Sequence, residues 1–389
     1  NPKELEHRIR EYWESNKIPN KLTKLDPKKK KFYLLDGPPY ANADAHVGHV
    51  KTTTLKDIWS KFKLLQGFTS WFQPGFDMHG LPIENQVEKE MEIRSKSDIE
   101  RIGIEQFILA CRAFATRYID VMNKQFEDLG VWMNWTSPYL TLTNDYIEGA
   151  WHTFKIAYKK GLLYHGLYPV HVCPRCETAV AYNEIEYTKL TDPSIYVKFP
   201  VAERKTIPEY FIIWTTTPWT LPANTGIMVH PDEDYVKVLV ENQILIIAKA
   251  LAENVMKKIG AECKIVDTLK GKDLEGMKYK HPLAEQFDFK IGERKIVLSE
   301  KYVTMESGTG LVHTAPGHGQ EDYKVGLENK LPTISPVKMN GTYDDRCGKF
   351  KGVFVKHADK MIINELKSLG LLLYEEKIND DYPQCWRCS

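Results

Sequence analysis

Two histidines separated by two residues begin the part of the sequence that could do chemistry. His46 and His49 enclose Gly48 in the segment HVGH, after an apolar stretch at residues 32–35 and the turn segment GPPY that starts at Gly37. Residues three apart lie on one face of a helix turn, and a helix N-terminus offers free N–H groups and a positive dipole end. The pattern predicts a phosphate-binding loop whose histidines stabilise charge developing on an attacked phosphate, with Gly48 allowing close backbone approach. The alternative is a pair of surface histidines on an ordinary helix, because short motifs often misfire.

A carboxylate lies near a second predicted strand end. Asp77 opens the segment DMHGLPIE, after a strand expected near residues 69–72. Ligands of parallel α/β sheets bind at the carboxyl ends of the strands. Asp77 is therefore predicted beside the same pocket, placed to bind an ammonium group such as the α-amine of an amino acid. Its plainer interpretation is a helix N-cap.

Two further segments combine hydroxyl, imidazole and carboxylate groups. They contain Thr215, Thr216, Thr217 and Trp219 in WTTTPWTLPAN, and His313 and Asp322 in HTAPGHGQED. Asp322 can bind an ammonium group, the threonines and His313 can orient an ester and a water, and Trp219 can form the wall of a small pocket. Each also has a plainer interpretation: strand-end β-propensity for the threonines, a satisfied strand histidine for His313, and a helix cap for Asp322.

Four of the seven cysteines form two CxxC pairs, Cys173 with Cys176 and Cys385 with Cys388. Four thiolates suit a tetrahedral structural zinc, and this usage favours a reducing compartment over a disulfide framework. The long separation of the pairs leaves buried or free thiols as the alternative. One zinc would hold together the two chain segments by which the chain leaves a first domain and returns to it.

The elements that position these groups follow from apolar periodicity. A strand at 32–35, a helix from Val47 to Leu65 closed by Gly67 and a strand near 69–72 predict a βαβ unit with a parallel sheet. Further helices are predicted at residues 4–16, 98–129, 144–160 and 357–369. From about Ser194, β-branched runs between Gly, Pro and Asp turns predict a β-rich, barrel-like domain. These runs lie at 196–201, 211–217, 226–229, 235–240, 244–247 and 295–298.

Length and composition limit the classes of protein. The 389 residues suffice for two domains, and the net charge of +1 means that any RNA contact needs a local basic patch. The sequence contains neither an apolar run of membrane length nor a signal-peptide pattern at its start, so we expect a cytoplasmic protein without membrane partners. We also expect a monomer. The chain begins at Asn1 and ends at Ser389 just after a CxxC pair, so both ends are interpreted as cuts.

The segments GPPYANADAHVGH and GFDMHGLPIE resemble the class I aminoacyl-tRNA synthetases, and within them the isoleucyl enzymes. HVGH looks like the HIGH signature of that family, with valine in its second position. The valyl and leucyl relatives have different residues where this chain has DMHG. The resemblance implies that Pro39, Tyr40 and Asp77 help to bind L-isoleucine. It also implies that His46 and His49 bind ATP, which is used with Mg²⁺, and its transition state.

The threonine-rich segment and the segment from Gly308 to Asp322, which fits GTGxVHxAPxHGxxD, resemble the editing domain of the same family. A pocket that holds isoleucine cannot strongly exclude valine, because one methylene is worth about 1–3 kcal/mol, a limit for which the isoleucyl enzymes are the standard example. The resemblance therefore implies hydrolytic editing of valyl-tRNA(Ile). Zinc-binding cysteines like these are present in some members of the family.

Together these features predict an α/β protein: the first half of a Rossmann-like nucleotide-binding domain with a parallel sheet, interrupted by an inserted β-rich, barrel-like editing domain. The predicted limits are 1–183, 184–378 and 379–389, the last being the return strand with the second zinc knuckle. The parent reaction would be ATP-dependent charging of tRNA(Ile) with isoleucine. These residues contain no KMSKS-like loop, so the chain lacks half of the ATP site and is expected not to form isoleucyl-adenylate by itself. The alternatives are a valyl-tRNA synthetase that clears threonine, a free-standing aminoacyl-tRNA deacylase, and a zinc-bearing RNA-binding module.

Overall fold

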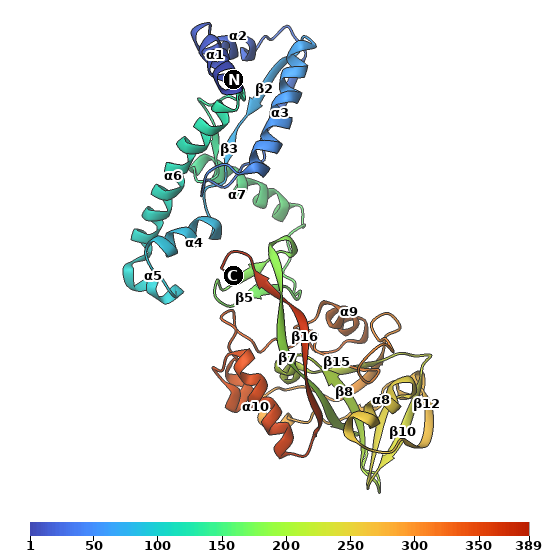
Figure 1. Ribbon diagram of the computed structural model, residues 1–389. Coiled ribbons are helices and arrows are strands. Elements are labelled where there is room, and N and C mark those ends of the chain that lie inside the picture. The colour runs from blue at the N-terminus through green and yellow to red at the C-terminus, as the bar shows by residue number, and fades with distance from the viewer. Residues whose placement is uncertain (389) are drawn as a thin grey trace. The chain divides into compact units, whose positions relative to one another are not determined.

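The computed structural model describes residues 1–388. The chain divides into two compact units, Asn1–His165 and Gly166–Ser389 (Figure 1). The domain limits expected from the sequence stay a prediction.

The first unit is a mixture of helices and short parallel strands. Its elements are α1 (Pro2–Ser15), α2 (Ile18–Thr23), β1 (Lys31–Leu35), α3 (Val47–Leu65), β2 (Thr69–Gln73), β3 (Gly75–Phe76), α4 (Leu81–Glu90), α5 (Lys96–Ile102), α6 (Ile104–Asp128), β4 (Tyr139–Leu140) and α7 (Asn144–Lys159). Strands β1 and β2 pair in parallel, from Lys31 with Thr69 to Leu35 with Gln73. The predicted βαβ unit is therefore confirmed.

One segment predicted to be helical throughout is divided into two helices. Residues 98–129 were expected to form a single helix, but α5 ends and α6 begins at Gly103, whose φ is +111°. A φ in this range favours glycine and is incompatible with an α-helix. The apolar stripe continues through the break, so periodicity alone does not show it.

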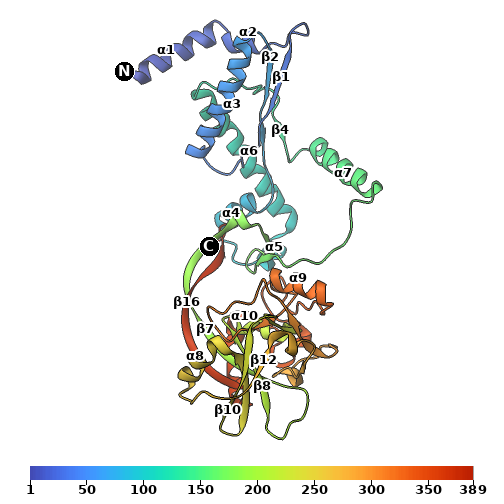
Figure 2. The ribbon, with the colours of Figure 1, turned by 90° about the vertical axis from the view of Figure 1, so that its right-hand side faces the viewer.

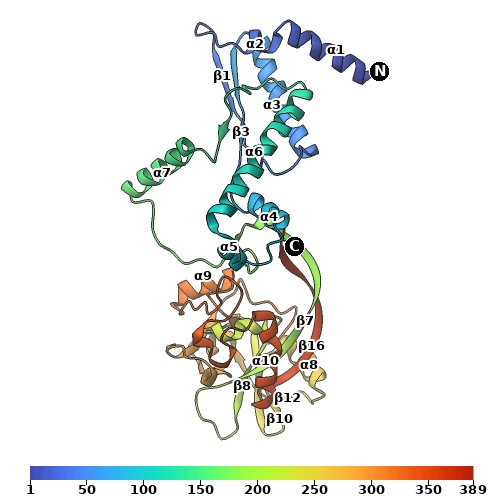
Figure 3. The ribbon, with the colours of Figure 1, turned by 90° about the vertical axis from the view of Figure 1, so that its left-hand side faces the viewer.

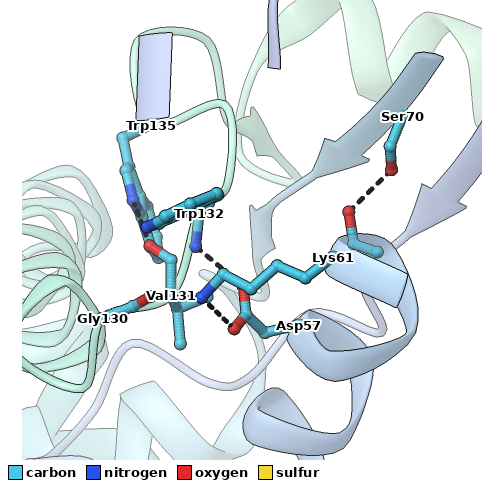
Figure 4. Close-up of polar contacts among 8 residues, drawn as sticks. Asp57, Lys61, Ser70, Gly130, Val131, Trp132 and Trp135 are labelled. Atoms are coloured by element: carbon cyan, nitrogen blue, oxygen red, sulfur yellow. Dashed lines mark hydrogen bonds and ion pairs between the residues drawn. The ribbon is translucent and has the colours of Figure 1, made fainter. Parts of the chain in front are cut away.

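Helix α3 buries polar residues and exposes its apolar stripe. Thr53, Asp57 and Ser60 are its buried residues, whereas the apolar side chains of Trp59 and Leu65 are exposed. The Ser60 and Ser70 hydroxyls lie 2.7 Å apart and connect α3 to β2 (Figure 4). This face of α3 is therefore connected to the strand by a hydrogen bond between two buried hydroxyls.

A buried carboxylate holds α3 to the segment that follows α6 (Figure 4). Asp57 Oδ1 accepts the Trp132 N–H at 2.9 Å, and its Oδ2 accepts from Lys61 Nζ at 2.6 Å. Lys61 Nζ also donates to the Gly130 carbonyl at 2.8 Å and lies 4.4 Å from the centroid of the Trp132 ring. Hydrogen bonds and a cation–π contact thus share one ammonium group.

The second unit is dominated by strands. Its elements are β5 (His171–Cys173), β6 (Thr178–Val180), η1 (Tyr182–Glu184), β7 (Ile185–Pro200), β8 (Glu209–Thr215), η2 (Pro218–Ala223), β9 (Gly226–Val229), β10 (Asp234–Val240), β11 (Gln243–Ala248), α8 (Lys249–Ile259), β12 (Lys264–Lys270), η3 (Gly271–Leu274), β13 (Lys278–Tyr279), η4 (Ala284–Gln286), β14 (Arg294–Leu298), β15 (Leu311–Thr314), α9 (Gln320–Asn329), η5 (Asp345–Phe350), α10 (Val355–Ser368) and β16 (Leu372–Cys385). The run predicted at 211–217 ends as a strand at Thr215, because Pro218 starts a 3-10 helix.

Part of the β-rich sheet closes on itself. The strands pair in the order β7, β8, β15, β9, β14 and β13. The ring closes where the Lys280 N–H donates to the Pro200 carbonyl at 2.8 Å and the Ala202 N–H donates to the Lys278 carbonyl at 2.9 Å. Inward side chains such as Phe199, Phe211 and Ile227 are fully buried. The barrel-like prediction is confirmed.

A long antiparallel ribbon joins the start of this unit to its end. Strand β7 pairs with β16 from Val197 with Leu372 to Ile185 with Cys385. The ribbon curves past the rest of the unit (Figure 2, Figure 3). Among the residues that the structure describes, no helix has both the length and the apolar character to cross a bilayer.

We expect Asp57→Ala to lower the free energy of unfolding by about 2–4 kcal/mol, because it leaves the Trp132 N–H and the Lys61 ammonium without their shared acceptor. Urea denaturation followed by circular dichroism would measure the change. Lys63→Ala is the control, since Lys63 lies on the same helix and contacts the exposed Gln66 side chain at 2.9 Å. Equal stability of Asp57→Ala and the unmodified chain would contradict the role of this contact.

Candidate functional site

The connection between β1 and α3 arranges the paired histidines. His46 is the N-cap of α3, and its Nδ1 accepts the Gly48 N–H at 3.0 Å. The His46 N–H donates to His49 Nδ1 at 3.4 Å, and the two rings stack with centroids 3.8 Å apart. A neutral imidazole whose Nδ1 accepts carries its proton on Nε2. Both rings can therefore donate an Nε2–H to a ligand, which suits phosphate oxygens.

The electrostatics of this loop favour the neutral form of His49. Partial burial is the main cause that lowers the pKa of His49, and the positive charge of Lys56 adds to it. Asp36, at the end of β1, is buried and forms an ion pair with Lys56, and burial raises the pKa of this carboxyl despite that lysine. The sequence analysis gave Asp36 no role, although an acidic residue directly after an apolar strand is a recognisable signal.

The residues predicted to bind an amino acid are brought together. The Asp77 N–H donates to the Pro39 carbonyl at 2.9 Å, and Tyr40 pairs with Asp77 in a parallel bridge. The Thr141 hydroxyl lies 3.3 Å from Asp77 Oδ1. Helix α4 begins after Gly80, so Asp77 is not its N-cap, and the plainer interpretation is removed.

A cavity of about 420 Å³ lies in the second unit between η2, β15 and the start of α9. All the residues predicted for this site line it: Thr215, Thr216, Thr217, Trp219, His313 and Asp322. Strand pairing brings the threonine segment and the histidine segment together, because β15 lies beside β8, with Val312 opposite Trp214. Two segments distant in sequence thus end at one side of the barrel.

A chain of hydrogen bonds fixes the state of His313. Asn224 Oδ1 accepts from the Tyr279 hydroxyl at 2.6 Å, so its amide nitrogen faces His313 and donates to Nδ1 at 2.9 Å. The proton of the imidazole is then on Nε2, which donates to the Thr220 hydroxyl oxygen at 3.0 Å. The Thr220 hydroxyl donates in turn to the Thr217 carbonyl at 2.8 Å. Burial lowers the pKa of His313 to about 3. His313 is therefore neutral and uses both nitrogens to hold the threonine segment.

The carboxylate of Asp322 also lines the cavity. Its Oδ2 accepts the Ala315 N–H at 2.9 Å, whereas the N-cap of α9 is Gly319. Asp322 therefore connects the first turn of α9 to the loop before it instead of capping the helix. Burial raises the pKa of Asp322 to about 6. At neutral pH the group is a carboxylate with one fixed hydrogen bond and can attract an ammonium group.

The four predicted metal ligands converge. The sulfur atoms of Cys173, Cys176, Cys385 and Cys388 all lie within 4.8 Å of one another. The Sγ atoms of Cys173 and Cys388 are 3.4 Å apart, too far for a disulfide of about 2.05 Å. A tetrahedral zinc with bonds of about 2.3 Å would place its sulfurs about 3.8 Å apart. The donor set and its spacing therefore fit a structural zinc.

Comparison with protein families decides the class. A family model described as tRNA synthetases class I (I, L, M and V) matches residues 8–296. The chain belongs to the class I tRNA synthetases. Isoleucine–tRNA ligases of Pyrococcus abyssi and Methanocaldococcus jannaschii are both 46% identical to it over 100% of its length. The isoleucine–tRNA ligase of Pyrococcus furiosus is 47% identical over the same share.

This synthetase chain spans 37% of the Pyrococcus relatives and 39% of the Methanocaldococcus relative. A solved structure titled "The crystal structure of GlLeuRS-CP1" is 16% identical, with a TM-score of 0.40, covering 47% of this chain and 99% of its own.

The sequence analysis did not single out several residues that line the cavity. They are Trp214, Thr220, Tyr302, Thr304, Ser307, Thr309 and His318. Trp214, Thr220, Thr309 and His318 lie inside the two predicted segments, so closer attention to those segments could have found them. Tyr302, Thr304 and Ser307 precede β15 in a polar loop, whose composition resembles that of an ordinary turn.

We expect the purified chain to contain about one zinc, held by the four thiolates, as measured by plasma mass spectrometry. Cys388→Ser should lower the zinc content by more than half and lower the melting temperature. Cys263→Ser is the control, because Cys263 is a free thiol of the same unit outside the cluster. A zinc-free chain with unchanged stability after chelation would contradict this structural role of zinc.

Proposed function

We propose that this chain is part of an isoleucyl-tRNA synthetase that activates L-isoleucine with ATP and Mg²⁺, charges tRNA(Ile), and hydrolyses mischarged valyl-tRNA(Ile). The observation that carries the proposal is the cavity of the second unit, where threonine hydroxyls, a neutral imidazole and a carboxylate surround one space. Similarity to isoleucine–tRNA ligases along the whole chain supports the choice of amino acid. We place the enzyme in the cytoplasm, as a monomer.

The loop between β1 and α3 would take part in the activation step. Asp77 would pair with the ammonium group of isoleucine, beside Pro39 and Tyr40. The Nε2–H groups of His46 and His49 would donate to phosphate oxygens of ATP as the isoleucine carboxylate attacks the α-phosphate. The bond between the α-phosphorus and the bridging oxygen breaks, and pyrophosphate leaves. Fixed donors of this kind are most useful where charge increases in the transition state.

The cavity would carry out the hydrolytic step. Asp322 would bind the ammonium group of the valyl ester, and the hydroxyls of Thr215, Thr216 and Thr217 would orient the ester and a water. The water oxygen forms a bond to the acyl carbon, the bond to the ribose oxygen breaks, and the protons pass to that oxygen and to solvent. Valine and tRNA(Ile) are the products, and no side chain is acylated.

His313 would act in this step as a positioning residue. Its two ring nitrogens are engaged by Asn224 and Thr220, so it has no lone pair for a water proton. Its contribution is to hold Thr220 and, through it, the Thr217 carbonyl. The threonine segment is thereby kept rigid while the substrate supplies the charge that Asp322 recognises.

The first test is deacylation of valyl-tRNA(Ile), isoleucyl-tRNA(Ile) and threonyl-tRNA(Val) by the chain. We expect selective loss of valine from tRNA(Ile), and Asp322→Ala should reduce that rate by at least about a hundredfold while circular dichroism stays unchanged, because the ammonium loses its partner. Selective loss of threonine from tRNA(Val) would assign the chain to the valyl enzymes. Unchanged deacylation by Asp322→Ala would refute the editing assignment.

The pH profile gives an independent test. Because the pKa of Asp322 is raised to about 6, the carboxylate is protonated below that pH and loses its attraction for the ammonium group. The kcat/KM for valyl-tRNA(Ile) should be level above about pH 7 and fall about tenfold per pH unit well below pH 6. Uncatalysed ester hydrolysis is subtracted at each pH. Asp322→Asn should remove the fall in kcat/KM below pH 6. A variant that keeps this fall would show that protonation of Asp322 is not its cause.

A further inference from the structure

Trp219 forms one wall of the cavity. Its ring lines the cavity together with His318, and the two rings meet edge to face, with centroids 5.2 Å apart and planes at 83°. Trp219 is a large planar group, so a small shift of its backbone changes the space available to a side chain. What holds its backbone therefore bears on which esters fit.

Both backbone polar groups of Trp219 are bound by side chains from elsewhere in the unit. The Trp219 N–H donates to Asp359 Oδ1 at 2.8 Å. The hydroxyl of Tyr343 donates to the Trp219 carbonyl in a short hydrogen bond. Asp359 comes from α10 and Tyr343 from the segment before η5. We call Asp359 and Tyr343 the clamp.

The clamp supplies a bond that the local structure cannot make. Trp219 follows Pro218 in the first turn of η2, and the first N–H groups of a helix have no partner within it. A carboxylate is the favoured acceptor at this end, because the helix dipole is positive there. Asp359 thus fills the role of a cap while coming from a distant element.

Both members of the clamp are themselves rigidly placed. Tyr343 is fully buried, and its N–H donates to the Val353 carbonyl at 3.1 Å. Asp359 is 5% exposed, and burial raises the pKa of its carboxyl to about 7. The nearby Lys356 ammonium is 3.0 Å from Asp192, with which it forms an ion pair. The clamp therefore holds the Trp219 backbone from two side chains that are packed in the interior of the unit.

We infer that Asp359 and Tyr343 are positioning residues that fix Trp219 and thereby set the upper size limit for the amino-acid side chain that the cavity accepts. The inference rests on the proposed editing function and adds to it the origin of its selectivity. Valine and isoleucine differ by one methylene, so the wall must hold its place to within about the size of that group. If the Trp219 backbone lost these hydrogen bonds, the ring could shift, and the larger isoleucyl ester would enter the cavity.

The experiment compares kcat/KM for valyl-tRNA(Ile) and isoleucyl-tRNA(Ile) in Tyr343→Phe, Asp359→Ala and Asp359→Asn. We expect Tyr343→Phe and Asp359→Ala to lower the valine-to-isoleucine ratio by at least about tenfold, mainly through faster loss of isoleucine. Asp359→Asn should keep most of the ratio, because its amide oxygen can accept the same N–H. Loss of stability alone would reduce both rates together and leave the ratio unchanged.

Two matched controls test the position of the effect. Tyr196→Phe removes a hydroxyl from a buried tyrosine of β7, and Asp273→Ala removes a carboxylate that accepts the Lys270 N–H at the start of η3, at 3.0 Å. Both should keep the ratio of the unmodified chain. A fall in the ratio as large as in the clamp variants would overturn the inference.

A double-mutant cycle decides whether the clamp acts through Trp219. Trp219→Ala should itself lower the ratio, and adding Tyr343→Phe should then change it less than twofold. Two outcomes would overturn the clamp alone. One is that the effects of Trp219→Ala and Tyr343→Phe on the ratio are independent and additive. The other is that the unmodified chain prefers the valyl ester but both clamp variants keep its ratio. An unmodified chain that does not prefer the valyl ester would overturn the proposed function and the clamp with it.

Discussion

The pairing of β7 with β16 is the constraint on which the second unit depends. Its register places Ile185 opposite Cys385 and so brings the two ends of the unit together. The four cysteine sulfurs then meet at the end of the ribbon, and an ion pair between Glu184 and Arg387 reinforces the junction. Further along, β7 passes into the barrel through β8. One antiparallel ladder therefore serves both the cysteine cluster and the wall that carries the threonine segment.

The cavity combines a buried neutral imidazole with a buried carboxylate. A buried imidazole is stable when it is neutral and both nitrogens are paired, as in His313. The same burial that lowers the pKa of His313 raises that of Asp322. Asp322 remains ionised at neutral pH because its pKa rises only to about 6. The cavity thus offers one negative group to a cationic ligand, within a frame of satisfied hydrogen bonds.

Local patterns could be predicted from the sequence, and contacts across the fold could not. The βαβ unit follows from apolar spacing and a closing Gly67, and the chemical types in the threonine and histidine segments could be recognised because they lie close together in the sequence. The break at Gly103 has no signal in the apolar stripe. Asp359 and Tyr343 carry no motif, because their role arises only when α10 and the preceding segment pack against η2.

Rejecting the larger of two side chains requires a different physical property from accepting it. A site that attracts isoleucine gains at most about 1–3 kcal/mol over valine, because a smaller ligand still fits. A site that must exclude isoleucine relies on steric repulsion, which is weakened when the wall of the site can move. Overpacking by one methylene costs about 1–3 kcal/mol when the surroundings cannot relax. Under the proposed editing function, the hydrogen bonds that anchor Trp219 would therefore be as important for exclusion as the ring itself. A cavity with the same lining residues but a free backbone at Trp219 would then bind both esters.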